Sequence, residues 1–384
     1  MKWATSILIF CVAVLIGLGM VMLYSASMAM ETNKSEMGAQ LLLSQFHWFL
    51  GGLICCVAAA SMDYRRLKRV SPWLLGFSVL LLALVFAPVI GPSIKGAHRW
   101  VCLPGLPHFQ SSELAKLALI LFLAAYGDRY QRLMDGFKKG LAIPGPVIAL
   151  VLGLIFIEPD RGCTILLAAV CGVMMIVAGA RLTYLLPPLA LLMVGMALSF
   201  LHDPMRMRRI MAWLHPEQNQ GGAGYQGREA MIALGSGGWT GLGLGNGRQK
   251  LGFVPEHHTD FIFSIMGEEL GLVVTMSVVL LFLALTICGV FIARRSSDAF
   301  GLLLSTGLTF MIGFQAFINM GVVTSMLPNK GMPLPFISYG GSNLVLMLIA
   351  LGLLLSVSRF ATETVKQKSS NPFEVALDAP PSHA

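Results

Sequence analysis

Long apolar runs alternate with short polar segments along nearly the whole chain. Each run approaches the ~20 residues that a helix needs to cross the ~30 Å hydrocarbon core of a bilayer. The pattern therefore predicts an all-α polytopic membrane protein with about ten transmembrane helices. Their expected ranges are 5–27, 46–62, 71–92, 112–127, 141–157, 163–180, 183–201, 261–293, 299–321 and 341–358. The first run is too long for the apolar core of a signal peptide and more runs follow it, so we expect a retained helix.

Composition supports this class. Of the 384 residues, 56% are hydrophobic and only 12% are charged, whereas a soluble domain has about 25% charged residues. We predict one membrane domain over residues 1–359. The polar, proline-containing segment 360–384 is expected to be a disordered cytoplasmic tail.

Lys and Arg residues in the short loops predict the orientation in the membrane. Segments 63–69, 127–140 and 293–295, together with Arg181 and the C-terminal tail, are basic and fall on the same side as the N-terminus. Because cytoplasmic loops carry an excess of Lys and Arg, both termini are expected in the cytoplasm. The opposite, extracytoplasmic face then carries three polar segments, 91–116, 202–260 and 326–343.

The segment 202–260 is the longest predicted loop, between the seventh and eighth spans. It contains three closely spaced arginines, Arg206, Arg208 and Arg209, which defy the positive-inside trend, although long loops largely escape that rule. One interpretation is a surface helix that rests on anionic lipid head groups. The other is a clamp for a phosphate or pyrophosphate, which guanidinium groups bind bidentately.

Several motifs resemble ligand-binding sites but lack the surrounding residues that such sites need. GLGLGNG (241–247) has no strand before it, so we expect a compact loop with positive φ angles and not a dinucleotide site. HHTD (257–260) lacks the partners of a zinc site, and we predict no protein-bound metal. A divalent cation that bridges a substrate pyrophosphate stays open. Cys102 and Cys163 are both expected on the outer face, where they could pair in an oxidising compartment.

Three carboxylates stand at the entry of the eighth span, Asp260, Glu268 and Glu269. If one helix runs through all of them, Asp260 lies roughly 14 Å beyond Glu269, at the height of lipid head groups and attached sugars. Gly267 and Gly271 would share a helix face that allows close approach of another helix, within about 20° of Asp260. The acid would then face the bundle or a cleft, or simply favour a helix N-terminus.

The same stretch, PEHHTDFIFSIMGEELG (255–271), resembles a signature of the SEDS family, the membrane glycosyltransferases of bacterial cell-wall synthesis. Further family motifs follow in the family's order along nearly the whole chain: GAHRW (96–100), FQSSELAK (109–116), EPDRG (158–162), GAGYQ (222–226) and LPFISYGGSN (334–343). The glycine loop, GEELG and GVVTSMLPNKGMPLPFISYGG are more similar to the division branch of the family than to the elongation branch.

The chain departs from the family pattern at four positions. Ser111 replaces a proline, Glu158 and Arg161 alter the usual QPDLG motif, and Asn343 replaces a serine. We expect Ser111 or Ser112 to cap the following helix in place of the proline. Glu158 and Arg161 are expected to alter the charge around Asp160 and to form their own pair.

The resemblance implies the SEDS fold and a reaction. The family polymerises lipid II, so a sugar 4-hydroxyl attacks an anomeric carbon and an undecaprenyl pyrophosphate leaves, with inversion. It implies Asp260 as the general base. We list as candidate substrate-binding residues Trp100, Lys116, Arg206, Arg208, Arg209, Lys330 and Ser338. Asp160, Glu268, Glu269, Gly267 and Gly271 are expected to serve structure or coupling.

Simpler roles stay open for three of these residues. Lys116 alternatively pairs with Asp160 or Glu113, Trp100 anchors the chain at the membrane interface, and Ser338 shapes a re-entrant turn.

Two other classes of function stay open, a lipid II flippase and a division scaffold. The predicted spans are nearly free of charge, which favours chemistry at one face over transport. The resemblance implies septal cell-wall synthesis in the cytoplasmic membrane, with elongation as the alternative. It also implies a class B penicillin-binding transpeptidase and other division proteins as partners, no nucleic acid, and no nucleotide cofactor.

Overall fold

A computed structural model describes residues 2–28, 35–87, 91, 99–101, 109–215, 224–250 and 259–369. Each predicted span coincides with a helix. These are α1 (Lys2–Met28), α2 (Ser35–Ser61), α3 (Leu67–Leu84), α4 (Ser111–Tyr130), α5 (Pro144–Ile157), α6 (Arg161–Val177), α7 (Leu182–Leu201), α10 (Ile262–Arg294), α11 (Ala299–Val323) and α12 (Gly341–Ser369). The predicted all-α fold is confirmed, with one small exception. Strands β1 (Trp100–Val101) and β2 (Phe109–Gln110) form a two-stranded antiparallel ribbon.

Short helices complete the described chain. The segment after α7 folds into α8 (Pro204–Leu214) and α9 (Tyr225–Ser236), so the predicted loop 202–260 is partly helical. Single turns η1 (Tyr64–Arg66) and η2 (Gln131–Leu133) and a π-helical turn η3 (Lys138–Ala142) occupy connections. Beyond residue 359, where we expected the membrane domain to end, α12 continues to Ser369. Residues 370–384 of the expected tail lie outside the described residues.

Eight helices in the described residues are long and apolar enough to cross a membrane. The chain is therefore a multi-pass membrane protein. Of the other two predicted spans, α6 has 17 residues, and α4 carries two charged residues in its first half, Glu113 and Lys116. The count of ten crossings thus stays a prediction.

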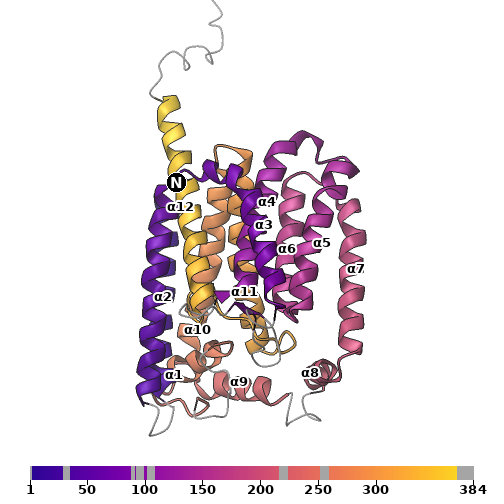
Figure 1. Cartoon of the computed structure of the whole chain (residues 1–384). Coiled ribbons are helices and arrows are strands. Elements are labelled where there is room, and N and C mark those ends of the chain that lie inside the picture. Colours follow the sequence, from indigo (N-terminus) through magenta and orange to yellow (C-terminus); the bar gives the residue numbers. More distant parts are fainter. Residues whose placement is uncertain are drawn as a thin grey trace, which may run out of the picture.

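The helices pack side by side in one bundle (Figure 1). Of the span-length helices in the described residues, α11 and α12 are the most buried, at 67% and 72%. Helix α2 packs along α12, and α10 packs against both α1 and α11. Helix α7 stands at the edge, since only 6% of its apolar segment is buried against 72% for α12. The N-terminus and the C-terminal end of α12 lie at one end of the bundle, and α8 and α9 lie at the other (Figure 1). Which side of the membrane each end faces stays a prediction.

Helix α10 is not continuous, which corrects the assumed geometry of its carboxylates. Gly271 has φ 76° and ψ −177°, so the helix breaks there. The carbonyls of Glu268 and Glu269, which would accept hydrogen bonds from the next helical turn, accept instead from Leu242 N (2.9 Å) and Gly243 N (3.0 Å). The loop after α9 thus replaces two helical hydrogen bonds with its own.

The glycine-rich loop has the conformation expected from its sequence. Gly241, Gly243 and Gly245 have φ values of 82°, 92° and 85°, which glycine adopts without a steric penalty. At Gly271 a Cβ atom would collide with the backbone of Thr240 and Gly241. The compact loop predicted for GLGLGNG is therefore confirmed, and it docks into the break of α10.

Candidate active site

Asp260 lies in the turn immediately before α10 and not within the helix. The expected common helix face of Asp260, Gly267 and Gly271 is therefore wrong. The carboxylate is half-buried and lies against Gly331, where a Cβ atom would overlap Oδ2. Asn319 of α11 fixes the backbone there, because its Nδ2 donates to the carbonyl oxygens of Asp260 (2.8 Å) and Met332 (2.6 Å). Asp260 thus has a defined position against the segment that connects α11 to α12.

Lys330 lies beside this position, one residue before Gly331. Its side chain runs past Gly162 at the start of α6, where a Cβ atom would lie 2.8 Å from Lys330 Cε. The ammonium nitrogen is buried and has no hydrogen-bond partner within the described part of the chain. Burial lowers the pKa of Lys330 to about 8, and the negative charge of Asp160 opposes this shift. Such a buried amine is available to an incoming anion.

Lys116 is occupied by protein groups. It is 3% exposed, and its Nζ donates to Glu113 Oε1 (2.7 Å) and to Gln315 Oε1 (3.2 Å). Asn343, one of the departures from the family pattern, donates to the other oxygen of Glu113 (3.1 Å). Of the interpretations open for Lys116, the structure therefore places it in the pair with Glu113.

Gln315 and Asn319 are site residues that our sequence analysis missed. Both interrupt the apolar run of α11, and they are one helical turn apart. That spacing was the available signal, because two amides on one face of an apolar helix need buried partners.

Ser338 and Trp100 take part in local structure. Ser338 Oγ accepts a hydrogen bond from Leu334 N (2.8 Å) and so stabilises the turn before α12, which was its simpler interpretation. Trp100 is half-buried and pairs with Gln110 in the β1–β2 ribbon. The neighbouring Arg99, which the sequence analysis also missed, donates to the carbonyls of Glu158 (3.1 Å) and Pro159 (2.7 Å).

The departures at 111 and 158 meet in space, which sequence spacing did not predict. Ser111 Oγ donates to Glu158 Oε1 (3.1 Å), and Glu158 Oε2 is buried without a partner among the described residues. The expected serine cap of α4 is wrong, since Gln110 is the N-cap residue and its side chain makes no capping hydrogen bond. Burial raises the pKa of the Glu158 carboxyl to about 8, so this group is mostly protonated at neutral pH.

Glu158 and Arg161 form no ion pair in the structure, so the pair expected between them is also wrong. The Arg161 guanidinium instead stacks over the Phe156 ring at 4.7 Å. Asp160, between them, is the N-cap of α6 and accepts from Cys163 N at 3.2 Å. Asp160 therefore has the structural role expected of it at this helix start.

Replacing Glu158 by Gln should change the pH dependence of stability. The folded-state pKa of about 8 exceeds the ordinary value of 4.5, so the native chain holds a proton that the unfolded chain loses. Wild-type stability should then fall as pH rises from about 4.5 to about 8, and the Gln variant should lack this component. Melting temperatures at pH 5.5 and pH 8 measure the effect, and a parallel decline in both proteins would contradict it.

Glu268 and Glu269 are 1% and 0% exposed, so both carboxylates are buried inside the protein. Glu268 accepts from the backbone nitrogens of Arg248 (2.7 Å) and Gln249 (3.2 Å). Glu269 pairs with Lys250 (2.6 Å) and accepts from Ser25 Oγ (2.5 Å). These contacts attach the glycine-rich loop to α10 and, through Ser25, to α1.

Gly267 allows a close approach, as predicted, but its neighbour is not another long helix. A Cβ atom at Gly267 would overlap the side chain of Leu234 in α9.

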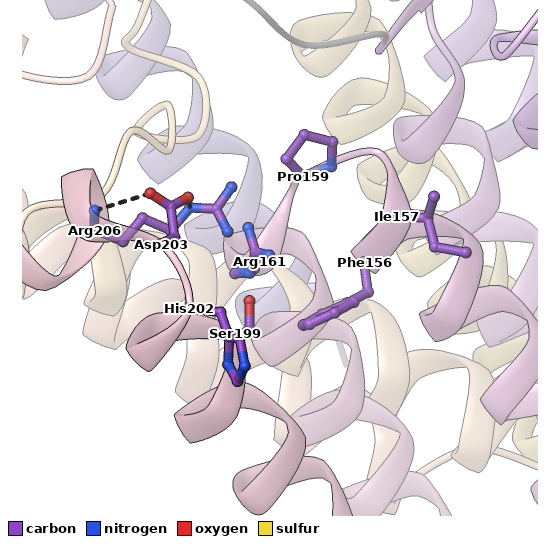
Figure 2. A pocket seen from close by; sticks show the side chains of 8 residues that line it. All are labelled: Phe156, Ile157, Pro159, Arg161, Ser199, His202, Asp203 and Arg206. Atoms are coloured by element: carbon purple, nitrogen blue, oxygen red, sulfur yellow. Dashed lines mark hydrogen bonds and ion pairs between the residues drawn. The ribbon is translucent and has the colours of Figure 1, made fainter.

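The three arginines of α8 separate into two environments. Arg208 and Arg209 are exposed, which agrees with the membrane-surface interpretation. Arg206 is half-buried, and its Nε lies 3.0 Å from Asp203 Oδ2. It lines a cavity of about 420 Å³ between the ends of α5 and α7 and the start of α6 (Figure 2).

Some predicted features lie outside the described residues. His257, His258 and Cys102 are among them, and Cys163 is a buried free thiol. Within the described ranges, no three His, Cys, Asp or Glu side chains cluster as metal ligands would.

The chain matches a known family model and is similar to named relatives. The FtsW/RodA/SpoVE family model, described as "Cell cycle protein", matches residues 5–363. A probable peptidoglycan glycosyltransferase FtsW of Geobacter metallireducens is 42% identical over 341 residues, covering 88% of this chain and 90% of the relative. A protein of the same name from Trichlorobacter lovleyi is 39% identical, with 92% of both chains covered.

Two solved structures are also similar. One chain, from work on a peptidoglycan synthase complex that coordinates polymerization and crosslinking, has a TM-score of 0.75 and 30% identity, with 92% of this chain and 97% of that chain covered. The rod shape determining protein RodA of Thermus thermophilus has a TM-score of 0.65 and 29% identity, with 92% and 95% covered.

Proposed function

The chain belongs to the FtsW/RodA/SpoVE family, and from this membership we propose that it is a peptidoglycan glycosyltransferase that polymerises lipid II during septal cell-wall synthesis. The observation that carries the proposal is a carboxylate and a buried cation on neighbouring segments at one end of the bundle. Asp260 lies against Gly331, and the preceding Lys330 has no protein partner in the described residues. Glycosyl transfer from a pyrophosphate donor needs a base and a cation.

In the proposed mechanism, Asp260 accepts the proton of the attacking 4-hydroxyl. The hydroxyl oxygen forms the new bond to the anomeric carbon as the bond from that carbon to the pyrophosphate oxygen breaks. Lys330 stabilises the charge that develops on the leaving oxygen, because a desolvated ammonium interacts strongly with it. Lys116 is left out of this step, since Glu113 and Gln315 already occupy its ammonium.

A divalent cation on the substrate pyrophosphate remains compatible with this arrangement. Phosphate oxygens supply ligands that Mg²⁺ prefers, and such an ion needs few protein carboxylates. Within the described residues we assign it no ligand set.

The division role rests on the relatives. Several curated relatives carry the name FtsW, whereas RodA is the structural neighbour that supports the elongation alternative. A class B penicillin-binding transpeptidase is the partner we propose, and a similar chain in a peptidoglycan synthase complex supports it. In this proposal the end of the bundle that carries Asp260 faces the extracytoplasmic side. The N-terminus and the C-terminal end of α12, at the opposite end of the bundle, then lie in the cytoplasm of a bacterial cell.

A fluorescent fusion tests the septal role. Placed after the C-terminal tail of the full chain, the label should form a ring at midcell in dividing cells. Scattered foci along the lateral wall would contradict the division role and support elongation, while leaving the polymerase activity itself in place.

A further inference from the structure

The cavity beside α8 has a polar side and an apolar side. Arg161, Asp203 and Arg206 converge from α6, the start of α8 and α8 itself, and Figure 2 shows Arg161 between Asp203 and Phe156. The other lining residues are Phe156, Ile157, Pro159, Ser199 and His202. Two guanidinium groups face one carboxylate, so the cavity has a net positive charge when His202 is neutral.

Arg161 is the residue that this environment leaves unsatisfied. Its Nε and Nη1 atoms are buried, and neither has a hydrogen-bond partner within the described part of the chain. Phe156 covers one face of the guanidinium but offers no acceptor for its N–H groups. Buried N–H groups without acceptors are costly, and an anion in the cavity would remove that cost. The family pattern has leucine at this position, which would need no anion.

Arg206 supplies a second cation at a suitable place. Asp203 holds its Nε at 3.0 Å, which fixes the orientation of the planar group. Two oriented guanidiniums match the oxygens of a phosphate, which they bind in bidentate fashion.

The surroundings indicate that the ligand is an amphiphile. Ile157 at the end of α5 and Leu201 at the end of α7 are each 63% exposed. Helix α7 is barely covered by the rest of the protein, and in a multi-pass membrane protein such an uncovered apolar surface is expected to face lipid. A lipid whose anionic head group is bound in this cavity would extend its hydrocarbon chain directly into the bilayer.

We propose that Arg161 and Arg206 bind the phosphate or pyrophosphate of a membrane-embedded lipid in this cavity. The lipid is either the polyprenyl-pyrophosphate-linked substrate, which rests on the proposed function, or an anionic phospholipid. Arg161 then gives this chain a phosphate contact that the family's leucine does not provide.

Binding to the full chain in phosphatidylcholine nanodiscs tests the proposal. Two probes distinguish the sources, farnesyl pyrophosphate and phosphatidylglycerol, with uncharged farnesol as the control. Each bound probe should raise the melting temperature of the wild-type chain. Arg161→Leu should weaken binding by about tenfold or more, and Arg161→Lys should fall between, because lysine lacks the planar fork. Arg181→Leu, an exposed arginine that lies away from the cavity and pairs with Asp135, should bind as the wild type does.

The melting temperature without probe separates binding from a structural role. Arg161→Leu removes two buried N–H groups that lack acceptors among the described residues, so the variant should melt at or above the wild-type temperature. If Arg161→Leu loses binding of farnesyl pyrophosphate, the ligand of the cavity is the polyprenyl-pyrophosphate-linked substrate. If it loses binding of phosphatidylglycerol, the ligand is a structural phospholipid. Wild-type affinity of Arg161→Leu for both probes, or a lowered melting temperature without probe, would overturn the proposal. The assay needs no turnover, so its failure leaves the polymerase function standing.

Discussion

Replacing Asp260 by Asn is expected to lower the rate of glycan polymerisation by about 10² to 10⁴, the usual range for loss of a general base. Asparagine has nearly the shape of aspartate, but its amide cannot accept the proton of the sugar hydroxyl. The contact with Gly331 and the hydrogen bond from Asn319 to the Asp260 carbonyl do not depend on the charge. The fold should therefore survive. The initial rate of lipid II consumption measures the effect.

The matched control for this change lies at the other end of the protein. Asp135 is exposed and pairs with Arg181, and Asp135→Asn should leave the rate nearly unchanged, since an exposed ion pair contributes little. Glu268→Gln is unsuitable as a control, because Glu268 is buried and accepts backbone hydrogen bonds. A wild-type rate in Asp260→Asn would exclude the catalytic role.

Of the proposed substitutions, replacing Lys250 by Met is expected to cause the largest loss in the free energy of unfolding. Lys250 and Glu269 form a pair whose side chains are 3% and 0% exposed. Lys250 also donates to the carbonyl and hydroxyl oxygens of Ser25, both at 3.1 Å. Removing one partner leaves a buried carboxylate without its cation, which typically costs about 3–5 kcal/mol. Thermal melts of the purified chain in one detergent should show a clearly lowered transition.

A second substitution should partly restore stability. In Lys250→Met with Glu269→Gln, neither charge of the buried pair remains, so the double variant should melt above the single one. Arg248→Met is the matched control in the same loop, because Arg248 is exposed and bonds Glu268 through its backbone nitrogen. Equal melting temperatures for Lys250→Met and Arg248→Met would contradict the role of the buried pair.

Apolar periodicity was sufficient to place the helices, because a bilayer requires long apolar segments with internally satisfied backbones. It was insufficient for α10. The composition of residues 262–294 suits one helix, whereas the break at Gly271 arises from backbone hydrogen bonds to a loop about 30 residues earlier in the chain. Such long-range competition leaves no periodic signal, although the positive φ of the loop glycines was predictable from GLGLGNG.

In the candidate site, too, some features could be predicted from the sequence and others only from the fold. The pairing of Lys116 with Glu113 follows from helical spacing, and Asp260 was found through a family motif. The contact between Ser111 and Glu158 joins positions 47 residues apart, and only the fold brings them together. Arg161 was noted as an unusual residue, but its unpartnered N–H groups depend on the side chains that surround it.

Glycan synthesis by the purified chain, with and without Asp260, is the most direct measurement of the central claim. Labelled lipid II would be incubated with each protein and with a class B penicillin-binding protein whose transpeptidase site is blocked, and the products separated on a gel. Long glycan chains are expected from the wild type and none detectable from Asp260→Asn at an equal folded fraction. Long chains from both proteins, or from neither while an established polymerase extends the same substrate, would contradict that claim.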